Sequence, residues 1–544
     1  MSVFKHYLVV CAISFLPLLI VVFSPSLFHT HDGLVHLPRM AAYYKAITSG
    51  QILPRWASDL NYGYGMPLFN FIYHTPYLIS ALFIRFGLSL ANSFKIVMII
   101  SYLLSGIAMF AFTHYLFGDT KKAFLVTIFY QFAPFRLVEL LVRGSFGEMY
   151  TYAFLPIVLY GLLKIVKKPS VPNIVGAGIA AGLLIISHNS ISLVFFGVAE
   201  LFILFFFHKK NIFYGIGSLI LGLLISAFYW LPALLEHKYT LGDLYMRDIF
   251  REHFPPLINF FIPNFLNSPQ LQTKGISVQF GIFHVGAIIV ALYILLARKK
   301  IDPQIKKLFL FSFVLIIGSL FLMQPVSTIV WEKISWLRQF QFPWRLLSVT
   351  SLATAFLSVS FFSFSIFKNK KVYYLVILGV IFSTIFYWNP PLGFDKIRDE
   401  GQFWNFPLTT TYWGETDVIW SAGPAKSYAK EQMEPIEGDV RISNMIKKSI
   451  VHTATVQSTS GGKIVDNTEY FPGWKAYVND SQTPIQFQDT NWRGLITFSV
   501  PAGTTNVKIV FEKSPTQKLG EYISEITLLT IFVASFTYIW KRRI

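Results

Sequence analysis

The stretch FHTHDGLVHLPRM, residues 28–40, follows directly on the first long apolar run of the chain. It combines Asp32 and Arg39 with several histidines, among them His31 and His36. Most of the remaining sequence is apolar. Because the stretch follows an apolar run, this cluster of ionisable groups lies just outside a predicted membrane helix. The arrangement predicts a polar loop at a membrane face, and ionisable groups at such a position are expected to be functional.

The composition of the chain is that of a membrane protein. Of its 544 residues, 54% are hydrophobic and only 14% are charged, whereas soluble domains carry about 25% charged residues. The net charge of +18 comes from short basic clusters between apolar runs, which is typical of orientation signals and argues against a nucleic-acid partner. Cys11 is the only cysteine, which excludes an intrachain disulfide. No phosphate-binding loop, dinucleotide fingerprint, GxSxG or HExxH motif occurs in the chain.

The apolar runs predict a polytopic protein with about 12 transmembrane helices, because a span needs about 20 apolar residues. The predicted spans are 7–28, 95–117, 123–141, 151–166, 172–187, 190–207, 211–234, 280–297, 307–323, 345–367, 372–388 and 521–540. The first run is longer than the apolar core of a signal peptide, so we interpret it as a retained span.

The positive-inside rule decides whether segment 71–90 crosses the membrane. If it does not cross, all dense basic clusters, from Lys5 to the tail at 541–543, fall on one side. We therefore predict cytoplasmic N- and C-termini and one long outer loop over residues 29–94. A domain of residues 1–388 would hold this loop and the spans up to 388.

A second, outer domain is predicted for residues 389–518, followed by the final helix and basic tail over 519–544. Several stretches of this domain alternate between apolar and polar residues, which indicates β-strands. They are TTYWGETDVIW (410–420), SIVHTATVQST (449–459), GLITFSV (494–500) and TNVKIVFE (505–512). The predicted fold is mainly α-helical, with a β-rich extracytoplasmic domain near the C-terminus.

The second half of the outer loop, LPRWASDLNYGYGMPLFNF (53–71), has the residue types of a sugar site. Aromatic rings and amides suit sugar binding, and glycines allow close approach of the backbone. The candidate substrate-binding residues here are Arg55, Trp56, Asp59, Asn61 and Tyr62, together with His31, His36 and Arg39 of the first stretch.

Two acidic residues are the catalytic candidates. Asp32 could act as a general base or bind a metal, and the alternative is that Thr30 or Asp32 simply caps the next helix. Glu148, in RLVELLVRGSFGEMY (136–150), faces the same side by the predicted topology. Its alternative role is a capping box with Ser145.

The remaining candidates lie at the outer ends of other spans. Arg143 precedes Glu148, and His188 and Asn189 occupy a predicted turn in ISHNSISLV (186–194), for which a purely structural role is the alternative. LRQFQFPWRLL (337–347) adds Gln341, Trp344 and Arg345. Arginine binds phosphate through a fixed fork, although snorkelling to lipid headgroups is the alternative for Arg345.

The motifs HDGLVHLPRM, LPRWASDLNYGYGMPLFNF, RGSFGEMY, SHNS and RQFQFPWRLL resemble integral membrane glycosyltransferases of the GT-C superfamily. The chain is more closely similar to the bacterial and archaeal membrane proteins called 6-pyruvoyl-tetrahydropterin synthase-related. The GT-C resemblance implies transfer of a sugar from a polyprenyl-phosphate-linked donor to an acceptor glycan, lipid or protein at the outer face of the cell membrane. It implies that Asp32 and Glu148 correspond to the two acidic loop positions, which would also hold a divalent cation such as Mg²⁺ or Mn²⁺ if one is used.

We keep two alternatives to a glycosyltransferase. One is a transporter or flippase of lipid-linked glycans, which would need polar residues along the middle of its spans. The other is a non-catalytic membrane protein that binds cell-envelope glycan.

Overall fold

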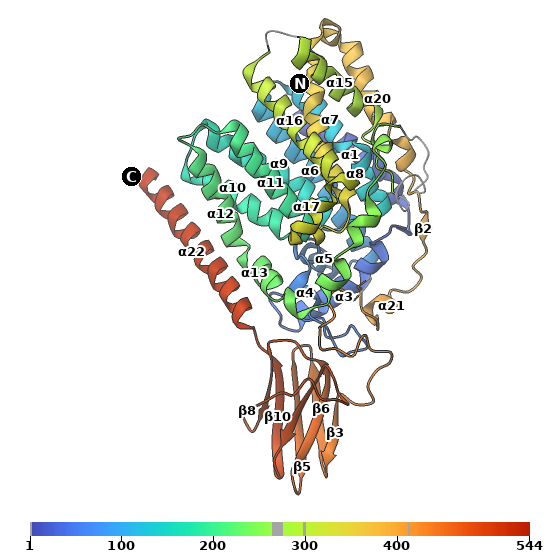
Figure 1. Ribbon diagram of the computed structural model, residues 1–544, viewed down its shortest axis with the longest axis vertical. Coiled ribbons are helices and arrows are strands. Elements are labelled where there is room, and N and C mark those ends of the chain that lie inside the picture. The colour runs from blue at the N-terminus through green and yellow to red at the C-terminus, as the bar shows by residue number, and fades with distance from the viewer. Residues whose placement is uncertain (1–2, 264–275, 298–300, 412–413, 544) are drawn as a thin grey trace.

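The computed structural model describes residues 3–263, 276–297, 301–411 and 414–543. It has two parts, a large helical bundle and a β-domain at one end of it, joined by the long final helix α22 (Pro515–Arg543), which runs beside the bundle (Figure 1). This confirms the predicted fold class, a mainly α-helical polytopic membrane protein with a β-rich domain near the C-terminus.

Among the described residues, eight helical segments are long and apolar enough to cross a membrane. They are Val3–Phe23, Leu90–Phe117 (α6), Glu148–Lys167 (α9), Asn189–Phe206 (α11), Pro303–Leu322 (α16), Pro343–Ser363, Lys370–Tyr387 and Pro515–Tyr538. The first comprises α1 (Val3–Phe15) and α2 (Leu19–Phe23), Pro343–Ser363 contains α19 (Leu347–Leu357), and Lys370–Tyr387 contains α20 (Lys370–Phe382).

The other four predicted spans have irregular shapes. Two are bent pairs of helices, α7 (Thr120–Gln131) with the segment Pro134–Arg143 at 49°, and α12 (Ile212–Ile225) with α13 (Ala227–Leu235) at 72°. Two are shorter apolar helices, α10 (Val171–Ile185) and α15 (Ile282–Ala297). The first bend precedes a proline, which cannot donate a backbone hydrogen bond to the preceding turn.

The start of the outer loop differs from the prediction. The first span ends at Phe23 rather than at residue 28, and β1 (Leu27–Phe28) pairs antiparallel with β2 (Phe394–Asp395). The chain beyond the last bundle helix therefore returns to the first loop.

Short helices occupy the rest of this loop. They are α3 (Gly33–Thr48), α4 (Leu68–Phe71) and α5 (Thr75–Arg85), which lie between the bundle and the β-domain (Figure 1). At 1.5 Å per residue, α5 is about 17 Å long, much shorter than the roughly 30 Å apolar core of a bilayer.

The β-domain consists of two antiparallel sheets. The five-stranded sheet has the order β4-β5-β10-β7-β8 and the three-stranded sheet the order β3-β6-β9. The strands are β3 (Met433–Gly438), β4 (Arg441–Lys448), β5 (Val451–Ser458), β6 (Gly462–Glu469), β7 (Trp474–Val478), β8 (Ser481–Thr483), β9 (Leu495–Val500) and β10 (Gly503–Phe511). Alternate residues of β5, β7 and β10 are buried, as expected for sheets with one face in a core.

The stretch 410–420 is not a strand in its described part. There Val418 makes only an isolated bridge with Thr240, although the alternation predicted a strand. The described part of 389–432 otherwise holds β2 and the short helix α21 (Gly401–Trp404). Four further short helices are α8 (Pro134–Val138), α14 (Gly242–Met246), α17 (Thr328–Lys333) and α18 (Ser335–Arg338).

Candidate active site

The loop that carries Asp32 is attached to the C-terminal end of the broken span, at Val142 and Arg143, by backbone hydrogen bonds. The His31 N–H donates to the carbonyl of Val142 (3.0 Å), and the Asp32 N–H donates to the carbonyl of Arg143 (2.9 Å). These two bonds place the Asp32 carboxylate beside the Arg143 side chain.

Thr30, not Asp32, caps helix α3. The Thr30 hydroxyl oxygen accepts from the Gly33 N–H (2.9 Å), and the Asp32 side chain makes no capping bond. The Asp32 side chain is therefore left to face the cluster described below.

Arg143 joins two buried glutamates. Its Nη1 lies 2.7 Å from both oxygens of Glu139 and 2.9 Å from Oε1 of Glu148. Both glutamate side chains are 0% exposed, so each needs a charged partner to remain ionised. The capping-box interpretation is wrong, because Gly147 is the N-cap of α9 and no side chain caps it.

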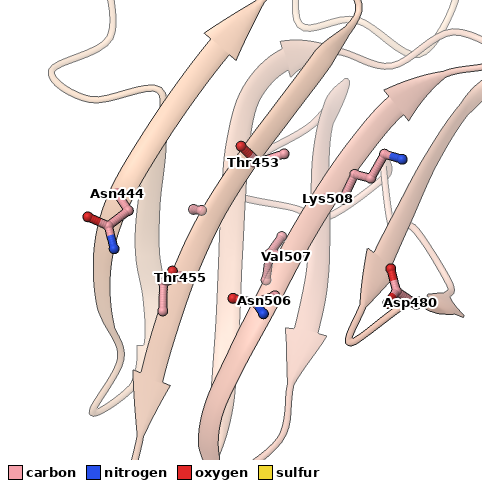
Figure 2. Close-up of a pocket in the computed structure, with 8 residues that line it drawn as sticks. Asn444, Thr453, Thr455, Asp480, Asn506, Val507 and Lys508 are labelled. Atoms are coloured by element: carbon pink, nitrogen blue, oxygen red, sulfur yellow. The ribbon is translucent and has the colours of Figure 1, made fainter.

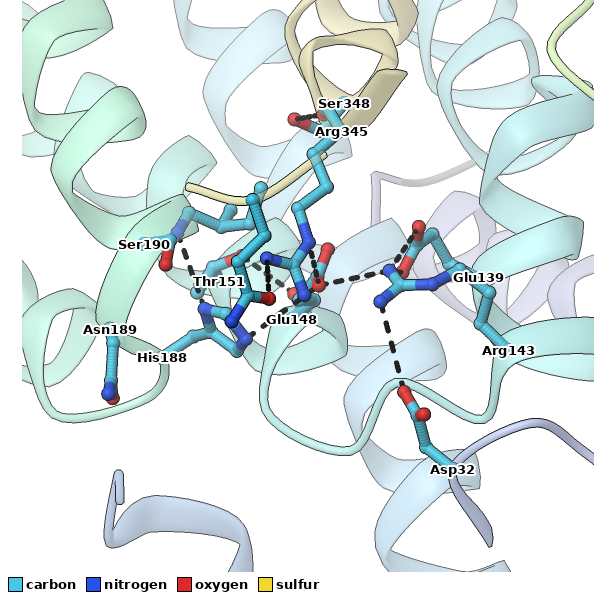
Figure 3. Close-up of polar contacts among 12 residues, drawn as sticks. Asp32, Glu139, Arg143, Glu148, Thr151, His188, Asn189, Ser190, Arg345 and Ser348 are labelled. Atoms are coloured by element: carbon cyan, nitrogen blue, oxygen red, sulfur yellow. Dashed lines mark hydrogen bonds and ion pairs between the residues drawn. The ribbon is translucent and has the colours of Figure 1, made fainter. Parts of the chain in front are cut away.

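Arg345 reaches the same carboxylate from a different span. Its Nε lies 3.1 Å from Glu148 Oε1, and its Nη1 donates to the Phe340 carbonyl (2.9 Å) and to Gln341 Oε1 (3.2 Å). Figure 3 shows Arg345 pointing toward Glu148 from one side and Arg143 from the other. Arg345 is therefore buried against Glu148 and is not a headgroup anchor.

His188 lies beside Glu148 and is the last member of the cluster. Its Nδ1 accepts from the Ile191 N–H at the start of α11 (3.3 Å). In a neutral ring the other nitrogen, Nε2, then carries the proton, and it lies 3.7 Å from Glu148 Oε1. Burial is the main cause that lowers the pKa of His188 to about 3, so the ring is neutral. The Tyr73 ring stacks on it with centroids 5.0 Å apart.

Among the buried polar atoms without a hydrogen-bond partner in the described part of the chain, three lie at this cluster. They are Oε2 of Glu148, Nε1 of Trp344 and Nε of Arg345, which contacts Glu148 as an ion pair only. The Trp344 ring also lies under the Arg143 guanidinium, 4.8 Å from its carbon. Unsatisfied buried groups are costly and mark sites where strain or a ligand is expected.

Asp32 is the exposed member of the cluster. Its Oδ2 lies 3.8 Å from Arg143 Nη2, and its side chain is 27% exposed, against 5% for Arg143 and 0% for Glu148. Formally, three carboxylates share two guanidinium groups. Asp32 is therefore the carboxylate of the cluster that solvent reaches most easily, and Figure 3 shows it on the far side of Arg143 from Glu148.

Several predicted binding residues lie elsewhere and have structural partners. Trp56, a predicted sugar-binding residue, packs against Trp474 and Phe511 of the β-domain and is buried, so its ring has no free face for a sugar. Arg55 is buried against Glu521 of α22 at 3.4 Å.

Three polar residues of the first loop and Asn189 also have protein partners. The Arg39 Nε donates to the Thr410 hydroxyl (3.0 Å), His36 Nδ1 shares a hydrogen bond with the Tyr77 hydroxyl (2.8 Å), and Asn61 Oδ1 accepts from the Ala425 N–H (2.8 Å). Asn189 donates to the Phe71 carbonyl (2.7 Å).

Asp59 and Tyr62 line a separate cavity at the β-domain. Together with Arg55, Trp56 and Asn61, they show that the candidates in 53–71 have partners other than the cluster around Glu148.

Glu139 is the cluster residue that the motifs did not single out. It is four residues before Arg143 and lies in a π-helical turn, Glu139–Arg143. The sequence feature that could have identified Glu139 is its position inside an apolar span, because an acidic residue there is costly unless it is paired.

The site does not fit a resident metal ion. Within the described ranges, no group of three or more His, Cys, Asp or Glu side chains is placed to hold one. Asp32 and Glu148 both face the Arg143 guanidinium, so a cation between them would compete with a fixed positive charge. We derive no step through a metal.

Comparisons with solved structures return membrane glycosyltransferases at low identity. The apo oligosaccharyltransferase of Archaeoglobus fulgidus has a TM-score of 0.42 and 13% identity over 77% of this chain and 61% of its own. The arabinofuranosyltransferase AftD from Mycobacteria has 0.41 and 16% over 70% of this chain and 27% of its own. ArnT from Cupriavidus metallidurans, bound to undecaprenyl phosphate, has 0.31 and 12% over 65% and 77%.

The chain thus spans less than two thirds of the first two of these proteins. No curated protein matches it. A family of membrane proteins, described by a 6-pyruvoyl-tetrahydropterin synthase related domain, matches over residues 69–390, which is more than half of the 544 residues. This range contains Glu139, Arg143, Glu148 and Arg345, and the chain belongs to this 6-pyruvoyl-tetrahydropterin synthase related family of membrane proteins.

Proposed function

We propose that this protein is a membrane glycosyltransferase that moves a sugar from a polyprenyl-phosphate-linked donor to an extracytoplasmic acceptor. The observation that carries the proposal is the exposed Asp32 carboxylate on a buried cluster of two arginines and two glutamates. Burying four ionisable side chains together is expensive. A positioned carboxylate at the membrane face, where a lipid-borne donor presents its phosphate, gives this cluster a chemical use.

The proposed reaction is a direct displacement at the anomeric carbon of the donor sugar. The acceptor hydroxyl oxygen forms the new bond to this carbon, and its proton passes to Asp32, the general base. The bond from the anomeric carbon to the phosphate oxygen breaks, and its electron pair leaves with the polyprenyl phosphate. A positioned general base typically accelerates such a step by about a hundredfold to ten-thousandfold.

Arg143 is the group best placed to stabilise the departing phosphate. Its guanidinium reaches toward Asp32, whereas Arg345 contacts the cluster through the buried Glu148. Glu139 and Glu148 hold the Arg143 fork in one orientation, and a preorganised charge is the usual main contribution to such catalysis. We therefore give Arg345 a positioning role, through Glu148.

The proposal places the protein in the cell membrane with cytoplasmic termini and residues 389–518 outside. Asp32, Glu148 and the β-domain would then share the outer face with an acceptor glycan, lipid or protein.

The test compares Asp32→Asn with Asp395→Asn in proteoliposomes. Asp395 is a matched control, because its side chain is 26% exposed and its carboxylate pairs with a neighbour, His29, at 2.9 Å. The probes are polyprenyl-phosphate-linked monosaccharides with membrane glycans as acceptors, and release of polyprenyl phosphate is measured.

We expect Asp32→Asn to lower the rate by at least about a hundredfold without changing the melting temperature. Thr30 still caps α3, so the fold does not depend on the Asp32 charge. Asp395→Asn should keep the wild-type rate. An unchanged rate in folded Asp32→Asn would overturn the assignment and favour transport or glycan binding.

A further inference from the structure

A cavity lies at the seam between the first loop and the β-domain, and none of its lining residues belongs to the acidic cluster. We call it the seam pocket. Its volume is about 390 Å³, and its lining includes Lys45, Asp59, Tyr62, Asn405, Tyr428 and Asn467. Ligand pockets in proteins typically hold about 300–1,000 Å³, so this cavity is large enough for one sugar ring.

Hydrogen bonds across the seam hold the two walls of the pocket together. The Lys447 ammonium donates to the Gly63 carbonyl (2.6 Å), and the Glu469 N–H donates to the Tyr64 carbonyl (2.9 Å). Trp56, which follows Arg55 in the same loop, inserts into the β-domain core. The pocket is therefore formed before any ligand binds, which lowers the entropic cost of binding.

The chemistry of the lining is that of a carbohydrate site. The rings of Tyr62 and Tyr428 stand nearly perpendicular, with centroids 5.3 Å apart, and Tyr428 is 60% exposed. An exposed aromatic ring offers an apolar face for a pyranose ring. Lys45 and Asp59 form an ion pair at 2.6 Å, so a donor and an acceptor for hydroxyl groups stand side by side.

A second cavity on the β-domain differs from the seam pocket in the residues that line it. It lies on the five-stranded sheet, has a volume of about 300 Å³, and is lined by polar residues such as Asn444, Thr455 and Asn506 (Figure 2). Its lining contains no aromatic residue. This surface is a suitable internal control.

We propose that the seam pocket binds a pyranose unit of the acceptor glycan. The identification of the bound sugar as the acceptor rests on the proposed glycosyltransferase function. The binding of a pyranose unit does not depend on it. The lining residues of the seam pocket, such as Tyr62 of the first loop and Tyr428 and Asn467 of the C-terminal part, would then bind the acceptor. The cluster around Glu148 would perform the transfer.

The first test measures binding alone. Full-length protein in detergent is applied to an array of neutral oligosaccharides built from glucose, galactose, mannose or N-acetylglucosamine. We expect binding to at least one of them and a loss of affinity of roughly fivefold in Tyr428→Ala, since one aromatic contact contributes about 1 kcal/mol. Asp59→Asn, which retains the side-chain shape, should also weaken binding.

Asn444→Ala is the matched control and should bind like the wild type. Tyr428 is exposed, so its removal should leave the melting temperature unchanged. Failure of the wild-type protein to bind any of these glycans, or equal binding by Tyr428→Ala, would overturn the proposal.

The second measurement separates this proposal from the proposed function. Asp32→Asn should bind the same glycans with wild-type affinity but fail to transfer. If Asp32→Asn transfers normally while Tyr428→Ala loses binding, the catalytic assignment fails and the seam pocket stands. If no glycan binds while Asp32→Asn abolishes phosphate release, the reverse holds.

Discussion

Gly144 is the residue on which the position of Asp32 depends. It has a φ of +66°, a region that residues with a side chain rarely adopt. A methyl group on it would overlap the Thr30 hydroxyl, which caps α3. Glycine therefore allows the first loop to lie directly on the broken span, with Asp32 beside Arg143.

We predict that Gly144→Ala displaces the Asp32 loop and lowers both stability and transfer. The positive φ alone should cost about 1–3 kcal/mol, and the overlap with Thr30 adds to this. The measurements are the melting temperature in detergent and the rate of polyprenyl phosphate release.

Gly118→Ala is the control for backbone strain. Gly118 has a φ of +62° and also follows a helix, but a methyl group there would meet no atom within 4 Å. It should lose stability through strain only and keep the transfer rate. Equal loss of transfer in both variants would contradict the docking argument.

At the scale of elements, strand β6 links the β-domain to the first loop. Its last six residues are buried, and the Glu469 N–H donates to the Tyr64 carbonyl. Burial and then the nearby Asp417 raise the pKa of Glu469 to about 8. Burial and then Glu415 raise the pKa of Asp417 to about 6. Both carboxyl groups are thus protonated in the folded protein at mildly acidic pH.

We predict that this junction loses stability as the pH rises from about 5 to about 8. An unfolded glutamate ionises near pH 4.3, so across this range the unfolded state binds fewer protons than the folded state, and the free energy of unfolding falls. Glu469→Gln cannot ionise. The melting temperature of the wild type relative to Glu469→Gln should therefore drop between pH 5 and pH 8, and a constant difference would contradict the prediction.

At the scale of the whole molecule, the β-domain sits at one end of the helical bundle, and the N-terminal helix reaches the other end (Figure 1). Short basic clusters, such as Lys209 and Lys210, lie between spans. From their distribution we predict that the β-domain faces outward.

Cysteine labelling tests this orientation in intact cells. With Cys11 replaced by Ser, an impermeant thiol reagent should modify Ser481→Cys, in the β-domain, but not Lys210→Cys, between α11 and α12. Both positions are exposed. Permeabilised cells, in which both should react, are the control, and the opposite pattern in intact cells would overturn the topology and the proposed outer site.

The class of the protein and the positions of its apolar segments could be predicted from the residues alone. Bilayer thickness imposes a length on every span, and that length can be read locally. All twelve predicted segments correspond to straight spans, bent pairs or shorter apolar helices, although their bends could not be predicted. The site candidates Asp32, Arg143, Glu148, His188 and Arg345 were also visible, as polar residues at the ends of apolar runs.

Only the tertiary structure decided which polar residues meet. Glu148 and Arg345 pair across two spans, and Glu139 became part of the cluster because a π-helical turn directs it to Arg143. Trp56 is of a residue type that suits sugar binding, but it packs into the β-domain. A residue's type shows which partners it can have, whereas the partner it does have depends on helix packing and loop docking between distant segments.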